Sequence, residues 1–243
     1  MRYIDLNVLL RKRRDWGKGK ELWKNQTLKS DFRDYFYNKC WYSESLLSGS
    51  DAAIDHFRPK AMVRQYMQYR YNELLRNTGY SWLKNNPSNY RFSCTYANRR
   101  TGEGGKSCYF PLSDTSEWLT EDGNEHETPL LLDPCNHDDV RLLSFMGNEV
   151  IPTTNEPFCI LRVEVSSSIY NLNNSTIKSP RAHVWENVVK TLDEYERGSI
   201  NKAACLRWLN DAVDRSAPFS ACAIACVNSL APDEIIAELD LTL

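Results

Sequence analysis

The segment Ile54-Asp55-His56-Phe57-Arg58-Pro59-Lys60 decides how the rest of the chain is interpreted. An Asp directly before a His, between two apolar residues, predicts two polar groups at the end of a short strand. Imidazole has an unperturbed pKa of about 6.5, so His56 can accept a proton near neutral pH. A carboxylate suits a hard divalent cation. The dipeptide is therefore a candidate base beside a candidate metal ligand.

Two asparagines extend this candidate site. Asn89 and Asn98 follow His56 by 33 and 42 residues. Phosphodiester hydrolysis needs a base for the attacking water and positive charge near the phosphate and the leaving oxygen, and one divalent cation can supply that charge. We expect His56 to be the base, and Asp55 and Asn98 to bind Mg²⁺ (or Mn²⁺). Asn89 is expected to hydrogen-bond the loop that carries Asp55 and His56, and so to hold the base in orientation.

The order Asp-His, Asn and, nine residues later, Asn resembles the ββα-metal finger of HNH endonucleases. In that family the His is the base, the Asp and the last Asn hold the metal, and the middle Asn supports the loop. The resemblance is strongest to one subfamily, the HNH nuclease subunits of Septu and Septu-associated retron anti-phage systems (the PtuB-like proteins), and it extends over most of the chain. The matching segments are residues 39–44, 54–60, 93–99 and 130–135, with weaker matches at 110–112 and 218–221.

The sequence departs from this family at two of four cysteine positions. Many relatives carry two Cys-x-x-Cys pairs that bind a structural zinc around the finger, whereas here the pairs are Cys40-x-x-Ser43 and Cys94-x-x-Ala97. Structural zinc normally has four ligands, and Ser and Ala are poor substitutes for Cys. We therefore expect no structural zinc, with Cys40 and Cys94 as core thiols and a site that lacks this brace.

The resemblance also implies partners. A nuclease effector of this kind acts with an ATPase subunit and, if retron-associated, with a reverse transcriptase–nucleic acid complex. The chain has no G-x-x-x-x-G-K-[ST] loop, so nucleotide control would come from such a partner. The implied substrate is nucleic acid, with DNA favoured by family habit and RNA feasible. Two alternatives stay open: a catalytically inactive finger in a scaffold subunit, and an unrelated protein in which the Asp-His pair is coincidental.

Charge is distributed unevenly along the chain. The net charge of −2 excludes a globally basic nucleic-acid binder, yet residues 1–30 carry nine Lys or Arg against three acids. Residues 114–127 carry six acids and no Lys or Arg. The basic segment could contact phosphate or form a solvated helix face. The same two interpretations apply to the candidate nucleic-acid contacts near the site, which are Arg58, Lys60, Arg99 and Arg100.

The 243-residue chain contains no run of about 18 apolar residues, so we expect no transmembrane helix and no membrane partner. The N-terminal segment lacks the apolar stretch of a signal peptide. We therefore expect a cytoplasmic protein whose eight cysteines stay reduced.

We expect an α+β fold, with a small ββα-metal (HNH) finger embedded in a mostly helical protein that has a C-terminal helical region. The predicted regions are a basic helical N-terminal region (1–39), the HNH nuclease core (40–112) and a mostly helical C-terminal region (113–243). The last region includes a candidate partner-docking surface around Trp185, Trp208 and Phe219.

Local patterns predict the individual elements. They comprise helices over 62–76 and from Thr95, strands over 89–94 and 158–165, a hairpin over 142–151 that turns at Gly147-Asn148, and helices over 182–196, 202–212, 221–230 and 232–239. Asp133, which precedes a Pro, could join the site, but a turn or cap role is expected. His137 with Asp138 and Asp139 resembles a metal cluster on paper, but a helix start is expected.

Overall fold

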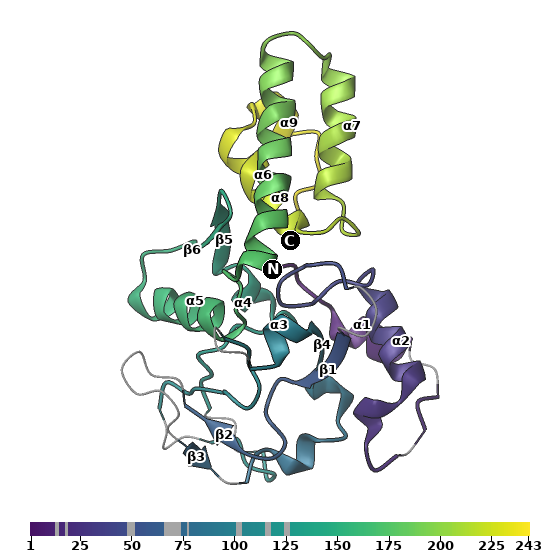
Figure 1. The fold of residues 1–243 in the computed structure, drawn as a ribbon, viewed down its shortest axis with the longest axis vertical. Helices are drawn as coiled ribbons and strands as arrows, with labels where there is room; N and C mark the ends of the chain where they lie inside the picture. The colour runs from purple at the N-terminus through teal and green to yellow at the C-terminus, as the bar shows by residue number, and fades with distance from the viewer. Residues whose placement is uncertain are drawn as a thin grey trace.

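The computed structural model describes residues 1–12, 15–17, 19–47, 52–65, 74–76, 78–100, 104–114, 118–123 and 127–243. The predicted α+β class is confirmed, because helices accompany three two-stranded antiparallel sheets in this part of the chain. Figure 1 shows the C-terminal helices as a lobe that projects from the rest of the molecule.

Capping side chains mark the start of both N-terminal α-helices. The elements in this part of the chain are α1 (Leu6–Arg11), the 3₁₀ helix η1 (Leu22–Lys24) and α2 (Gln26–Tyr35). The side chains of Asp5 and Asn25 accept hydrogen bonds of 3.2 and 2.9 Å from backbone N–H groups in the first turns of α1 and α2. Phe32 of α2 is fully buried and stacks on Trp41, with ring centroids 5.2 Å apart. The helix is thereby attached to the part of the core that lies beneath the candidate site.

Two strands and a short helix carry the candidate site. They are β1 (Ala52–His56), β4 (Tyr90–Cys94) and α3 (Thr95–Asn98), and the 3₁₀ helices η2 (Ser81–Leu83) and η3 (Pro87–Asn89) precede β4. β1 and β4 pair antiparallel, with Asp55 opposite Arg91 and His56 opposite Tyr90. The Asp-His pair at a strand end, the strand near residues 89–94 and the helix from Thr95 are therefore confirmed.

The helix predicted over residues 62–76 is wrong at both ends. There, β2 (Val63–Arg64) pairs antiparallel with β3 (Leu74–Arg76), and residues 66–73 lie outside the described residues. Arg64 N donates to the carbonyl of Cys108 at 2.9 Å, and the carbonyl of Arg64 accepts from Phe110 N at 3.0 Å. Because these long-range bonds satisfy the backbone groups that a helix would pair locally, they override the helical spacing of the apolar residues.

The strand predicted over residues 158–165 is also wrong. This segment follows α4 (His137–Val140) and the hairpin of β5 (Leu143–Met146) and β6 (Glu149–Pro152), and it lies within α5 (Pro157–Ile169). The carboxylate of Glu156 accepts hydrogen bonds from Phe158 N at 3.1 Å and Cys159 N at 2.7 Å, and Pro157 occupies the first turn. This cap and the proline start a helix in spite of the strand-like apolar residues that follow. The predicted hairpin is confirmed.

The four C-terminal helices are confirmed, although the first begins before the predicted residue 182 and the last is shorter than predicted. They are α6 (Ser175–Glu196), α7 (Lys202–Val213), α8 (Ser220–Leu230) and α9 (Asp233–Ile236). α8 is buried on all sides from Ser220 to Val227: Cys222 belongs to the main core, and Val227 to a second core among the C-terminal helices. The helix therefore joins the lobe to the body of the molecule.

None of the described helices is both long enough and apolar enough to cross a membrane.

The docking surface predicted from three aromatic residues needs correction. Phe219 is only 4% exposed and packs in the main core, and Trp185 is partly buried against both cores. Trp208 on α7 is 62% exposed. Burial in the core removes Phe219 from any docking surface. The partly buried Trp185 and the exposed Trp208 keep the predicted role as a proposal.

Candidate active site

Five of the eight candidate site residues line one cavity of about 420 Å³. Its wall includes the predicted base and both predicted metal ligands, together with two of the four predicted nucleic-acid contacts. These residues are His56, Asp55, Asn98, Lys60 and Arg99. Asn89, Arg58 and Arg100 lie outside this wall. Residues that are distant in sequence are therefore brought together by the pairing of β1 with β4 and by the position of α3.

The His56 ring is held by the turn that follows η2. Its Nε2 lies 2.9 Å from the carbonyl oxygen of Lys84, which also accepts a 2.6 Å hydrogen bond from the hydroxyl of Tyr90. A carbonyl oxygen can only accept, so Nε2 carries the hydrogen and Nδ1 is left with a free lone pair. The ring packs edge-on against Trp23 and Tyr90, with centroid distances of 5.0 and 5.1 Å. Orientation and tautomer are thus set by the protein.

Burial also sets the charge of His56. The pKa of this imidazole is lowered to about 4, mainly by burial and to a smaller extent by the positive charge of Lys60, while the hydrogen bond to the Lys84 carbonyl and the charge of Asp55 act in the opposite direction. At neutral pH the ring is therefore neutral, which is the form that can accept a proton.

The Asp55 carboxylate is held by two buried side chains that were not singled out from the sequence. The Tyr42 hydroxyl donates to Oδ2 at 2.6 Å, and the Lys106 ammonium lies 3.1 Å from Oδ2 and 3.3 Å from Oδ1. Lys106 Nζ also donates to the main-chain carbonyl of His56 at 2.7 Å. Burial raises the pKa of Tyr42, and the Asp55 charge adds to this effect, so the phenol stays a donor. Tyr42 lies in a segment that matches the family, whereas no sequence signal marked Lys106.

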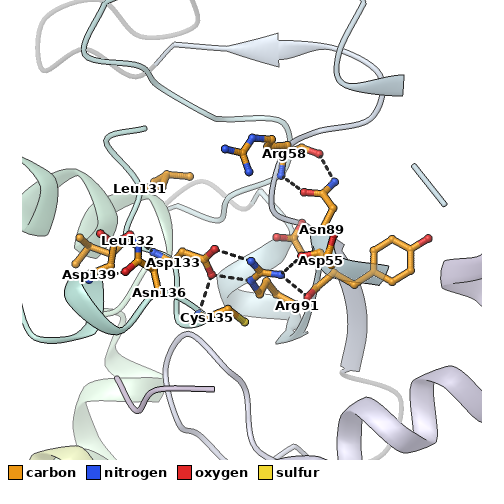
Figure 2. Close-up of polar contacts among 12 residues, drawn as sticks. Asp55, Arg58, Asn89, Arg91, Leu131, Leu132, Asp133, Cys135, Asn136 and Asp139 are labelled. Carbon is orange, nitrogen blue, oxygen red and sulfur yellow. Dashed lines mark hydrogen bonds and ion pairs between the residues drawn. The ribbon is translucent and has the colours of Figure 1, made fainter. Parts of the chain in front are cut away.

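The side chain and backbone of Asn89 are hydrogen-bonded to the residues that follow His56. Its side-chain oxygen accepts from Arg58 N at 2.8 Å, and its amide nitrogen donates to the Arg58 carbonyl at 3.0 Å (Figure 2). The carbonyl of Asn89 also accepts from Phe57 N at 2.8 Å. Three hydrogen bonds therefore fasten the two residues that follow His56 to the end of η3, just before β4.

Asn98 is placed by the C-terminal end of α3. Its carbonyl accepts from Ser107 N at 2.6 Å, and the carbonyl of Ala97 accepts from Lys106 N at 2.8 Å. Gly105 allows this close approach, because a Cβ at its φ of +104° would lie 2.1 Å from the Arg99 carbonyl oxygen. The side chain of Asn98 is half-buried on the cavity wall, so its amide oxygen is a possible ligand beside Asp55.

The four candidate nucleic-acid contacts have different surroundings. Lys60 Nζ lies 3.5 Å from the centroid of the Trp23 ring, and Arg99 is exposed at the cavity. Arg58 instead forms an ion pair with the buried Glu127, with Nε 2.7 Å from Oε1. Arg100 is exposed and lies over the ring of Tyr109, 4.7 Å from its centroid. Lys60 and Arg99 are therefore the best-placed cations for a phosphate in the cavity.

The four positions of the altered Cys-x-x-Cys pairs lie together. Cys40 and Cys94 are buried, and the Ser43 hydroxyl oxygen lies 3.9 Å from the Cys94 sulfur. The hydrogen bond with Cys40 raises the pKa of Cys94, and burial adds to this effect, so the Cys94 thiol stays protonated. With the buried Ala97, the cluster offers only two good zinc ligands, and the lack of a structural zinc stays a prediction.

Arg91 ties the site to the segment at residues 130–135. Its Nε and Nη2 donate to the two carboxylate oxygens of Asp133 at 2.7 and 2.5 Å (Figure 2). These contacts give Asp133 the expected structural role. The expected helix start at His137 is confirmed, because this residue opens α4 and two acids lie in its first turn. One of these acids, Asp139, also forms an ion pair with Arg162 at 2.7 Å.

No protein-family model matches the chain. The chain is similar to the Septu protein PtuB of Bacillus mycoides (strain KBAB4), with 29% identity over 198 residues that make up 79% of this chain and 62% of the relative. It therefore spans less than two thirds of the length of this curated relative. The resemblance to the PtuB-like proteins inferred from the motifs is confirmed as homology to this protein.

Proposed function

We propose that this homologue of a Septu protein is a metal-dependent HNH-type endonuclease that hydrolyses phosphodiester bonds in nucleic acid, as an effector of anti-phage defence. One observation carries the proposal. A neutral histidine, a carboxylate and an amide oxygen share the wall of one cavity with Lys60 and Arg99. This is the set of groups that phosphodiester hydrolysis requires.

His56 is the proposed general base, acting through Nδ1. Its Nε2 is occupied by the Lys84 carbonyl, so the proton of the attacking water would go to Nδ1. The hydrogen bonds of Asn89 to Arg58 and Phe57 hold the adjoining loop, which makes Asn89 a positioning residue.

Asp55 and Asn98 are the proposed ligands of a Mg²⁺ or Mn²⁺ ion. Their hard oxygen donors fit such a cation, and both residues line the cavity. When bound, the ion would neutralise charge on the scissile phosphate and stabilise the leaving oxygen. Lys60 and Arg99 would contact neighbouring phosphates and orient the strand.

The substrate class is the sugar–phosphate backbone of DNA or RNA. A base that activates external water needs no ribose 2′-OH, so the chemistry is compatible with both polymers. The family resemblance favours DNA. It also suggests an ATPase subunit as partner and, in a retron-associated system, a reverse transcriptase–nucleic acid complex. Trp208 on α7 is the exposed aromatic residue around which we propose that a partner docks.

The test is cleavage by a reconstituted system. The protein is assembled with the products of its neighbouring genes and incubated with plasmid DNA or total RNA and Mg²⁺, comparing wild type with His56→Ala. His183→Ala is the matched control, because His183 is 72% exposed on α6. We expect His56→Ala alone to abolish metal-dependent cleavage. Equal cleavage by wild type and His56→Ala would remove His56 from the mechanism, and no cleavage by either with partner binding intact would favour the scaffold alternative.

A further inference from the structure

The fully buried ammonium of Lys106 has no part in the mechanism proposed above. It contacts both carboxylate oxygens of Asp55, at 3.1 and 3.3 Å, and donates to the His56 carbonyl at 2.7 Å. One cation therefore touches the side chain of the proposed metal ligand and the main chain of the proposed base. The residue is 0% exposed and lies behind the cavity wall.

The backbone around Lys106 keeps the ammonium in this position. Lys106 N and Ser107 N donate to the carbonyls of Ala97 and Asn98 at 2.8 and 2.6 Å, so the segment is bonded to α3. Its side chain reaches across to β1. Lys106 thus links the strand that carries Asp55, through its side chain, to the helix that carries Asn98, through its backbone.

The position of Lys106 affects the charge that the cavity offers to a metal ion. Among the described residues that line the cavity, Asp55 is the one carboxylate, and Lys60 and Arg99 are cations. Lys106 neutralises Asp55 from behind, so a divalent cation that bound Asp55 would meet a positive charge at short range in a poorly screened environment. Such a site has too little negative charge to bind a divalent cation tightly by itself.

We infer that Lys106 is a built-in counter-cation of Asp55, which positions the carboxylate and the His56 main chain and also weakens divalent-metal binding in the absence of nucleic acid. This inference rests on the proposed function. A phosphate of the substrate supplies the missing negative charge, so metal and nucleic acid bind together. The site therefore binds the metal ion mainly when a substrate is present.

The test is a calorimetric titration of the full-length protein with Mn²⁺. Lys106→Met has a side chain of similar length without the charge, and we expect it to bind Mn²⁺ about ten-fold more tightly than wild type, which corresponds to about 1.4 kcal/mol. Lys106→Arg keeps the charge and should bind Mn²⁺ as weakly as wild type. A short DNA duplex should tighten Mn²⁺ binding in wild type more than in Lys106→Met. Cleavage by Lys106→Met should still fall, because the His56 carbonyl loses its donor.

Lys39→Met is the matched control. Lys39 is also 0% exposed, but its ammonium binds the carbonyls of Arg215 and Ala217 and is not on the cavity wall. Loss of this charge should leave Mn²⁺ affinity unchanged. If Lys106→Met does not fold, Lys106→Gln keeps an amide donor for the His56 carbonyl and serves the same comparison.

The outcomes separate the two proposals. A purely structural role for Lys106 predicts weaker or unchanged Mn²⁺ binding in Lys106→Met, and that result would overturn the inference while leaving the nuclease proposal in place. Asp55→Asn should abolish Mn²⁺ binding in both the wild-type and the Lys106→Met backgrounds. If it has no effect in either, the metal site itself is wrong, and the proposed function fails together with the inference.

Discussion

The charge of His56 depends on its surroundings, because burial against Trp23 and Tyr90 lowers its pKa to about 4 from an ordinary value of 6.5. The neutral imidazole is therefore available at every pH above this value, although a base with a low pKa has less driving force for proton transfer. The proposed role of His56 as base would therefore depend on the orientation of its ring, which the Lys84 carbonyl fixes.

A pH dependence of stability follows from the lowered pKa of His56. Above pH 6.5 the residue is neutral in both the folded and unfolded states and contributes no pH dependence. As the pH falls from 6.5 to 4, the unfolded chain binds a proton that the folded protein does not bind, so the folded state loses stability, by about 3 kcal/mol at pH 4. Urea unfolding across this range should show His56→Gln losing less stability than wild type. Parallel curves for the two proteins would contradict the prediction.

Asn89 offers a test of the loop that follows His56. Asn89→Ala leaves the Arg58 N–H and carbonyl without their partner, so we expect a loss of about 1–3 kcal/mol in the free energy of unfolding and a lower kcat. Chemical denaturation and cleavage kinetics measure the two effects. Asn86→Ala is the control, because Asn86 is exposed and, within the described part of the chain, its side chain bonds only Ser88, so kcat should stay at the wild-type value.

At the scale of the elements, the site depends on the contact between α3 and the segment at Gly105–Ser107. Gly105 adopts a φ of +104°, and an added Cβ would lie 2.1 Å from a backbone oxygen. A side chain in the way could rotate at low energetic cost, but two backbone segments in contact cannot move apart so easily. The orientation of Asn98 relative to Asp55 is consequently controlled by a glycine outside the motif.

Gly105→Ala is therefore expected to destabilise the protein by more than about 2 kcal/mol and to disturb the cavity. Thermal unfolding and the cleavage rate would both report the change. Gly123→Ala is the matched control, since Gly123 also has a positive φ, of +82°, but no atom of the described residues lies within 4 Å of the added Cβ. That variant should lose about 1–2 kcal/mol from backbone strain alone. Equal losses in the two variants would remove the close approach as the cause.

At the scale of the molecule, the segment at residues 39–44 joins the site to the C-terminal lobe. The buried Glu44 carboxylate accepts hydrogen bonds from the Ser220 hydroxyl at 3.1 Å and from Ala221 N at 3.2 Å, at the start of α8. The Lys39 ammonium binds the carbonyls of Arg215 and Ala217. These contacts attach the core beneath the site to the start of α8.

Glu44→Gln should weaken this connection. The variant loses a charged acceptor at the start of α8, so we expect faster amide exchange over residues 220–227 and a loss of about 2 kcal/mol or more in the free energy of unfolding. Hydrogen–deuterium exchange of the two proteins measures the change. Glu186→Gln, at a position 69% exposed on α6, should leave the exchange of α8 unchanged. Unchanged exchange in Glu44→Gln would show that α8 is held by packing alone.

Local sequence patterns determined much of this protein. The Asp-His pair at a strand end, the helix after Cys94, the hairpin at Gly147-Asn148 and the four C-terminal helices could all be predicted. Each of these depends on short-range periodicity, capping or turn residues, which act over a few positions. The homology to a Septu protein was also evident from the spacing of these motifs.

Only the tertiary structure decided which groups hold the site in place. Tyr42 and Lys106 meet Asp55 across 13 and 51 residues, and the carbonyl that fixes the His56 ring lies 28 residues away. The pairing of β2 with β3 likewise depends on partners at Cys108 and Phe110. A buried charge or backbone group needs a partner to be stable, and that partner can lie far away in the sequence. Local sequence patterns therefore do not predict which residue it is.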